Sequence, residues 1–114
     1  LFMAEKGCWP DWDMAFGRAF CTQAYPSSPS AYRYLNSGAW VGYAAAAYAL
    51  LTELIAFTPG LDDQHVVAHL FVDRPHLFAL DYQCNLFQSF QLEDGSVKRL
   101  SAPTPHVINT NTNT

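Results

Sequence analysis

The segment Tyr34-Leu35-Asn36-Ser37-Gly38, together with Asp62-Asp63-Gln64 downstream, decides the fold of this chain. The first segment predicts a polar turn, because Gly permits backbone geometries that other residues resist. Residues 44–57 lie between the two segments, are rich in Ala and Leu, and contain neither Gly nor Pro. They predict a long helix that Pro59-Gly60 ends. Asp62 is then placed to cap a second helix, with Asp63 in its first turn.

Short apolar runs around these segments predict strands. The predicted strands cover residues 1–4, 31–35, 40–43, 78–81, 86–90, 90–92, 97–100 and 105–109. Residues 93–96 predict a hairpin turn, residues 8–12 a compact turn around a proline, and residues 14–20 one or two helical turns. Strands followed by helices and then by further strands favour an α/β or mixed α+β body.

The composition indicates a folded chain that can bury a core. Of its 114 residues, 50% are hydrophobic and 15% are aromatic, which excludes a disordered chain. Charged residues make up only 14%, well below the ~25% typical of soluble domains. The length suits one domain or part of one. A low surface charge favours a piece of a larger body whose remaining surface is covered by other residues.

The charge pattern argues against nucleic acid and membrane as partners. The formal net charge is -4, and among the six basic residues only Lys98 and Arg99 are adjacent. Nucleic-acid binding needs clustered cations to neutralise phosphates, so we predict no nucleic-acid partner. The longest apolar run, residues 39–56, is shorter than the ~20 residues that a membrane span needs, and polar residues interrupt it. We therefore predict no membrane span.

The three cysteines are Cys8, Cys21 and Cys84, and the odd count leaves at least one of them unpaired within the chain. Cys8 and Cys21 flank one aromatic, proline-containing loop and are able to close it as a disulfide. Three reduced and mostly buried thiols are the alternative. The sequence leaves both open.

Several polar segments are candidates for a sugar site. The side chains of Asn36 and Ser37 can donate and accept hydrogen bonds, which suits sugar hydroxyls, and Gly38 allows close approach. An ordinary polar turn is the alternative. The carboxylates of Asp62 and Asp63 could orient a sugar hydroxyl, accept a proton or bind a divalent cation. A helix N-terminus that favours negative charge, without chemistry, is the alternative.

Aromatic and histidine side chains give weaker signals. The indoles of Trp9 and Trp12 could stack on sugar rings, or they could pack in the core under a loop. His65 and His69 lie four residues apart on the second predicted helix and share a face. Their spacing suits a metal, but the zinc-protease pattern needs Glu after the first His. Because no third ligand is evident in the sequence, we predict no metal-binding residue.

Asp81 follows an apolar strand and precedes Tyr82-Gln83-Cys84. A carboxylate at a strand end either has a functional role or caps a turn. The sequence does not choose between these roles.

Read together, these segments resemble the glycosyltransferase domain of procollagen-lysine hydroxylases and their algal, protist and viral relatives, over roughly residues 2–111. The segments that carry the resemblance are Ala4-Glu5, Cys8-Trp9-Pro10-Asp11-Trp12, Tyr32-Arg33-Tyr34-Leu35-Asn36-Ser37-Gly38, Val41-Gly42-Tyr43-Ala44, Asp62-Asp63-Gln64, Leu80-Asp81 and Leu86-Phe87-Gln88. Their order and similar spacing make the combination specific, although each motif alone is weak.

The resemblance implies a partial GT-A (Rossmann-like) α/β fold with a mixed sheet and two main helices. It implies a domain over residues 1–108 that forms the sugar- and acceptor-side part, followed by a polar tail at 109–114. The implied activity is transfer of a hexose, glucose or galactose, from a UDP-sugar to a hydroxylysine-linked or similar protein acceptor. A collagen-like chain is one candidate acceptor. The implied location is the secretory pathway, in the lumen of the endoplasmic reticulum.

The resemblance also implies the roles of individual residues. Asp62 and Asp63 are the expected catalytic residues. The expected substrate-binding residues are Trp9, Trp12, Asn36, Ser37, Gly38, Gln64 and Asp81. The family holds Mn²⁺ through an upstream Asp-x-x-Asp motif and a later His, which neutralises the leaving diphosphate.

Two departures from the family pattern bear on activity. No Asp-x-Asp occurs before Cys8, and Asn109 stands where the family has the later His. His106 is three residues earlier and, on a strand, would face the opposite side from Asn109. We expect this chain alone to be inactive. The alternative to an enzyme is a non-catalytic relative that binds glycans or collagen.

Overall fold

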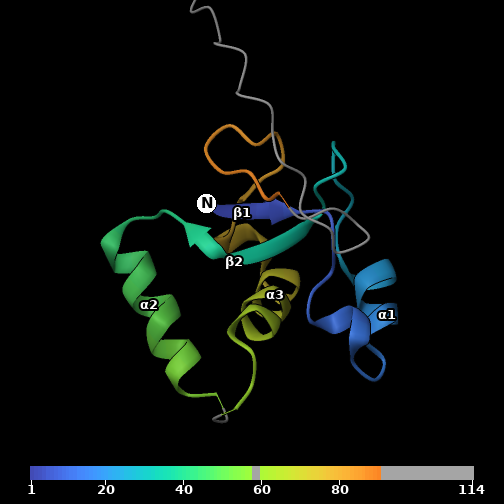
Figure 1. Ribbon diagram of the computed structural model, residues 1–114. Coiled ribbons are helices and arrows are strands. Elements are labelled where there is room, and N and C mark those ends of the chain that lie inside the picture. Colours follow the sequence, from blue (N-terminus) through green and yellow to red (C-terminus); the bar gives the residue numbers. More distant parts are fainter. Residues whose placement is uncertain (58–59, 91–114) are drawn as a thin grey trace, which may run out of the picture.

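The computed structural model describes residues 1–57 and 60–90. A three-stranded mixed sheet lies at its centre (Figure 1). Strand β1 (Phe2–Glu5) is the middle strand and pairs antiparallel with β2 (Tyr34–Trp40) and parallel with β3 (Leu80–Asp81). The main helices are α2 (Ala44–Ile55) and α3 (Asp63–Asp73). The α/β class with a mixed sheet and two main helices is therefore confirmed.

Short helical turns complete the described part. The loop after β1 contains η1 (Asp11–Asp13), α1 (Gly17–Ala19) and the π-helical turn η2 (Phe20–Ala24), and η3 (Pro75–Leu77) follows α3. The predicted hairpin at 93–96, the predicted strands at 97–100 and 105–109, and the tail at 109–114 lie outside the described residues, as do His106, Asn109 and all but the first residue of the predicted strand at 90–92. None of the described helices is long and apolar enough to cross a membrane.

The core lies between the sheet and α3. Helix α3 directs its buried side chains at β2, where Leu35 is 1% exposed. Tyr25 joins the core from the loop and accepts a hydrogen bond through its hydroxyl from the Leu35 backbone N–H at 3.2 Å. The buried apolar core consists of Phe2, Ala4, Cys8, Cys21, Tyr25, Leu35, Val67, Ala68, Phe71 and Leu80.

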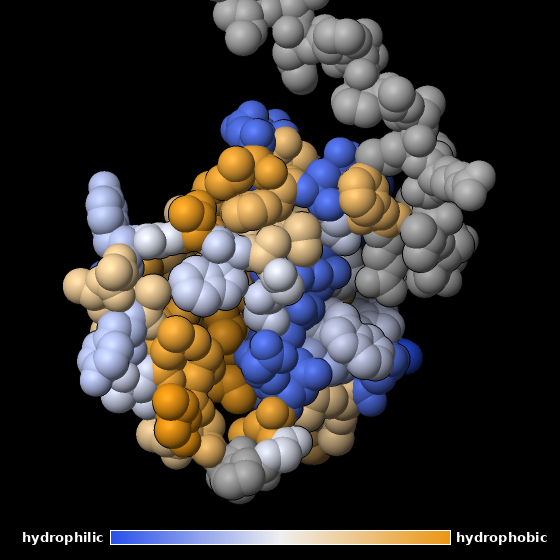
Figure 2. Space-filling view, turned by 60° about the vertical axis from the view of Figure 1, so that its left-hand side comes forward, coloured by the Kyte–Doolittle hydropathy of each residue, from blue (hydrophilic) through white to orange (hydrophobic). Residues whose placement is uncertain are grey.

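Helix α2 has no buried residue. An ion pair between Glu53 and Arg74 ties it to the end of α3. An apolar pocket of about 280 Å³ lies between α2, the start of β1 and η3. Hydrophobic side chains gather on the face that Figure 2 brings forward, where α2 lies.

Cys8 and Cys21 form a disulfide, with a Cα–Cα distance of 5.9 Å, and Cys84 is free. The disulfide left open by the sequence is therefore present. It closes the loop that holds η1 and α1, and such a cross-link stabilises the fold chiefly by restricting the unfolded chain.

Two strand predictions are wrong within the described residues. Asn36-Ser37-Gly38 lies inside β2 rather than in a turn before a strand at 40–43. Met3 pairs with Asn36 while Phe2 pairs with Trp40, so the three intervening residues form an irregularity in the ladder. The side-chain oxygen of Asn36 accepts a hydrogen bond from the Gly38 N–H at 2.7 Å. The predicted turn is therefore a hydrogen-bonded irregularity within β2 and does not separate two strands.

Residues 86–90 form no strand, because the amides of Leu86 and Phe87 donate to the carboxylate of Asp81 instead of to a neighbouring strand. The helical turns predicted at 14–20 begin later, at Gly17. The preceding Phe16 has a φ of 63°, which is outside the right-handed helical region.

Glu5 is a charged residue in the core, with only 3% of its surface exposed. Burial raises the pKa of its carboxyl group, and hydrogen bonding to Asn36 and Gln64 opposes that rise. Because the pKa is raised in the folded state, Glu5 contributes stability that is present below its ordinary pKa of 4.5 and is lost as the pH rises through the folded pKa.

Glu5→Gln should therefore gain stability over the wild type as the pH rises above 4.5, the ordinary pKa of the carboxyl group. Urea unfolding at a series of pH values measures this difference. Asp13→Asn, at an exposed carboxylate, is the control and should not reproduce the trend. A stability difference between Glu5→Gln and the wild type that stays constant as the pH rises from 4.5 to 7 would contradict the prediction.

Gly17 has no room for a side chain, because a Cβ there would lie 1.6 Å from the backbone oxygen of Asp11. Gly17→Ala should lower the free energy of unfolding by about 2 kcal/mol or more, since the loop must shift to accept it. Gly7→Ala is the matched control, because a Cβ at Gly7 meets nothing within 4 Å. Chemical denaturation of both variants tests this, and equal stabilities would contradict it.

Candidate functional site

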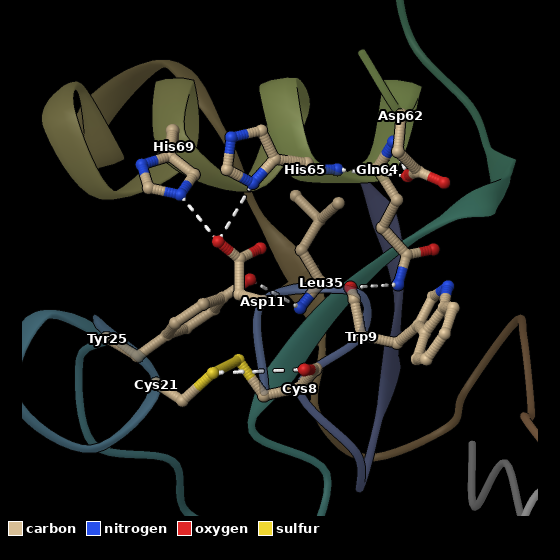
Figure 3. A network of polar contacts seen from close by, with 10 residues as sticks. All are labelled: Cys8, Trp9, Asp11, Cys21, Tyr25, Leu35, Asp62, Gln64, His65 and His69. Carbon is tan, nitrogen blue, oxygen red and sulfur yellow. Dashed lines mark hydrogen bonds and ion pairs between the residues drawn. A yellow bond between two sulfur atoms is a disulfide. The ribbon is translucent and has the colours of Figure 1, made fainter. Parts of the chain in front are cut away.

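Three segments meet at the N-terminal end of α3, and the side-chain amide of Gln64 joins them. Its Nε2 donates to Glu5 Oε1 at 2.6 Å and to the Trp9 carbonyl oxygen at 2.8 Å. Its Oε1 accepts from the Ser37 backbone N–H at 3.2 Å. Gln64 is 8% exposed; its bond to Glu5 is buried, and its bonds to Ser37 and Trp9 are partly buried. Figure 3 shows this amide between the end of α3 and the Trp9 loop.

The two predicted catalytic carboxylates have different surroundings. Asp62 is the N-cap of α3, as predicted, and its Oδ1 accepts from the backbone N–H groups of Gln64 at 2.9 Å and His65 at 3.2 Å. Asp63 is exposed, and within residues 1–57 and 60–90 its Oδ2 accepts only from the Ser37 hydroxyl, at 3.4 Å. Asp62 is therefore engaged in helix capping, while Asp63 remains accessible to a ligand.

Asn36-Ser37-Gly38 lies beside this end of α3, and its predicted contact with a sugar stays a prediction. Ser37 contacts Gln64 through its amide and Asp63 through its hydroxyl. The side-chain oxygen of Asn36 holds the Gly38 N–H, so the local turn is internally bonded. Ser37 is the member of the tripeptide that connects it to α3.

Trp9 and Trp12 are on the surface rather than in the core. Their exposed fractions are 55% and 43%. The backbone of Trp9 is held by Gln64, and the guanidinium of Arg18 lies 5.2 Å from the ring of Trp12. Of the two tryptophans, Trp9 is the one whose backbone is bonded to Gln64, the neighbour of Asp63 on α3.

Asp81 is 4% exposed and accepts three backbone hydrogen bonds. The donors are the N–H groups of Asn85, Leu86 and Phe87, at 2.9, 2.7 and 2.8 Å. Burial alone would raise the pKa of Asp81, but these donors hold it below its usual value. The geometry is that of a turn cap, which the sequence left as an alternative. A substrate contact through Asp81 stays a prediction.

The structure also brings together a cluster of possible metal ligands that the sequence did not predict. Asp11 Oδ1 lies 2.9 Å from His65 Nδ1 and 2.8 Å from His69 Nε2. These ligand-type atoms are close enough together to hold a metal ion. The spacing of the two histidines was visible in the sequence. Their carboxylate partner was not, because it comes from η1, more than 50 residues upstream.

Comparison with known proteins identifies the family. The profile of the family described as PLOD GT domain matches residues 1–114. The chain is 41% identical over 103 residues to procollagen-lysine,2-oxoglutarate 5-dioxygenase of Drosophila melanogaster, which covers 86% of this chain and 13% of that protein. It is 34% identical over 89 residues to uncharacterized protein R699 of Acanthamoeba polyphaga mimivirus, which covers 78% of this chain and 17% of that protein.

The name of a third relative includes both a hydroxylase and a glycosyltransferase activity. The chain is 32% identical over 93 residues to multifunctional procollagen lysine hydroxylase and glycosyltransferase LH3 of Rattus norvegicus, over 78% of this chain and 12% of that protein. The chain thus spans between 12% and 17% of the length of these curated relatives. No solved structure matches it.

The mixed sheet flanked by helices is consistent with a partial GT-A glycosyltransferase domain. The profile match over the whole chain agrees with the family resemblance of the sequence segments. This chain therefore belongs to the family of PLOD GT domains, the glycosyltransferase domains of procollagen-lysine hydroxylases.

Proposed function

We propose that this chain forms the sugar- and acceptor-side part of a glycosyltransferase that transfers a hexose, glucose or galactose, from a UDP-sugar. The acceptor is a hydroxylysine-linked or similar site on a protein, such as a collagen-like chain. The observation that supports this most is the meeting of Trp9, Ser37 and Asp63 around the buried amide of Gln64.

Each of these groups suits a carbohydrate. The exposed indole of Trp9 offers an apolar face to a sugar ring, and the hydroxyl of Ser37 can donate to or accept from a sugar hydroxyl. The carboxylate of Asp63 can orient a sugar hydroxyl or accept the proton of an incoming nucleophile. Gln64 positions them, because both protons of its Nε2 and its Oε1 are bonded to other segments of the chain.

The transfer that we propose uses Mn²⁺, which neutralises charge on the leaving diphosphate when it is bound. The described residues do not fit that ion. Mn²⁺ favours oxygen ligands, whereas Asp62 is engaged in capping α3 and Asp63 offers a single carboxylate. The cluster around Asp11 has two imidazoles. We therefore assign the manganese ligands to residues other than those described.

A non-catalytic relative that binds glycans or collagen is the second candidate. The poor fit of the described residues to Mn²⁺ favours it, since a sugar can bind to the exposed indole and polar groups without a metal. It differs from the enzyme in one testable respect, because its affinity for a glycan needs neither nucleotide nor metal.

We place the parent protein in the lumen of the endoplasmic reticulum. The disulfide between Cys8 and Cys21 supports this location, because such bonds persist in oxidising compartments. The procollagen-modifying names of the relatives point the same way.

The test is UDP release by the parent protein with Mn²⁺ and a panel of UDP-sugars. Asp63→Asn should lower turnover at least about 100-fold, because it removes the accessible carboxylate without removing a buried contact. Asp73→Asn is the matched control at the other end of α3, is also exposed, and should turn over normally. Asp62→Asn removes the charge but keeps an effective N-cap, so its rate of UDP release shows whether Asp62 contributes to the reaction beyond capping α3.

Full turnover by a folded Asp63→Asn variant would contradict the role of this carboxylate. A folded parent protein that releases UDP from no donor would contradict the enzyme. In that case, glycan affinity measured without Mn²⁺ and nucleotide decides whether the binding function replaces it.

A further inference from the structure

We propose that Asp11, His65 and His69 bind a zinc ion that fastens the aromatic loop to α3. The aromatic loop is the segment of residues 8–13, which contains the exposed indoles of Trp9 and Trp12. This proposal does not depend on sugar transfer, because it concerns a separate set of side chains and a different metal.

The geometry of the three side chains is the first argument. His65 and His69 are four residues apart on α3, so their rings lie on one face, with ring centroids 4.3 Å apart. Both direct a nitrogen at the same oxygen of Asp11, at 2.9 and 2.8 Å (Figure 3). A tetrahedral zinc ion with bonds of about 2.0–2.1 Å separates its ligand atoms by about 3.3 Å. To reach that separation, Asp11 Oδ1 and each histidine nitrogen need to move apart by about 0.4–0.5 Å, and all three ligand atoms already lie within 4.8 Å of one another.

The second oxygen of Asp11 is the next argument. Asp11 is 2% exposed, and its Oδ2 is buried with no hydrogen-bond partner among the residues that the structure describes. A buried carboxylate oxygen without a partner is costly, so such atoms call for a missing ligand or ion. Two histidine N–H groups explain the contacts of Oδ1 but leave Oδ2 unexplained. A divalent cation at the carboxylate compensates its buried charge.

The surroundings hold these ligands in place before any ion binds. The ring of Phe20 stacks on His69, with centroids 3.8 Å apart and planes 6° apart. The backbone carbonyl of Asp11 accepts a hydrogen bond from the Met14 N–H at 3.0 Å, and the disulfide closes the same loop. A site whose ligands are already oriented loses little conformational freedom on binding.

The ligand set selects the ion. Two imidazoles and one carboxylate suit zinc and similar transition metals, whereas Ca²⁺ and Mg²⁺ favour sites made of oxygen atoms. Three protein ligands leave the fourth position of a zinc ion to water. The side chain of His69 is 43% exposed, which gives an ion and its water a path to the cluster.

The experiment uses the folded 114-residue chain, with its disulfide intact and Cys84→Ser introduced to remove the free thiol. After treatment with a chelator, the chain is titrated calorimetrically with zinc chloride and, separately, with magnesium chloride. We expect one zinc ion per chain and no magnesium binding. Cobalt(II) in the same site should show the intense visible absorption of tetrahedral coordination.

His69→Gln removes an exposed ligand and should weaken zinc binding at least about 100-fold. His76→Gln is the matched control, because His76 is exposed on η3 and is not part of the cluster; its zinc affinity should equal that of the wild type. Asp11→Asn is the second variant. Far-UV circular dichroism confirms that each variant is folded.

Two results would overturn the proposal. One is a folded wild-type chain that binds no zinc, which would leave the three side chains as a hydrogen-bonded group. The other is zinc binding that survives unchanged in both His69→Gln and Asp11→Asn, which would place the ion elsewhere. Neither result bears on UDP release, so failure of this site and failure of the proposed transferase are distinguishable.

Discussion

The side-chain amide of Gln64 is the interaction on which the candidate sugar surface depends. It donates to a carboxylate on the central strand and to the backbone of the aromatic loop, and it accepts from the irregular part of β2. Since it is buried, each lost bond would leave a polar group without a partner. One amide thus sets the relative position of three segments that are distant in the sequence.

The aromatic loop is fixed at more than one place, which explains how it can present exposed indoles in a defined position. Gln64 holds it at Trp9, the histidines of α3 hold it at Asp11, and the disulfide closes it at Cys8. These attachments lie along one helix and one loop (Figure 3). Binding groups on a loop that is attached at several points keep their geometry when a ligand binds.

Features set by local chemistry could be predicted from the sequence. The long helix followed from composition, and the cap of α3 followed from Asp62 ahead of an apolar run. Features that depend on contacts between residues distant in the sequence could not be predicted from it. Asn36-Ser37-Gly38 was expected to form a turn between strands, but pairing with β1 places it within β2. The carboxylate partner of His65 and His69 was missed for the same reason, because only the folded loop brings Asp11 to them.

Amide hydrogen exchange in Gln64→Ala tests the central role of this side chain most directly. In the wild type, the Ser37 N–H is bonded to Gln64 and should exchange slowly. In the variant, exchange in residues 8–12 and 34–40 should accelerate at least about tenfold, while α2, which does not contact the amide, should keep its rates. Unchanged exchange in both segments would contradict the account, since the three segments would then hold their positions without Gln64.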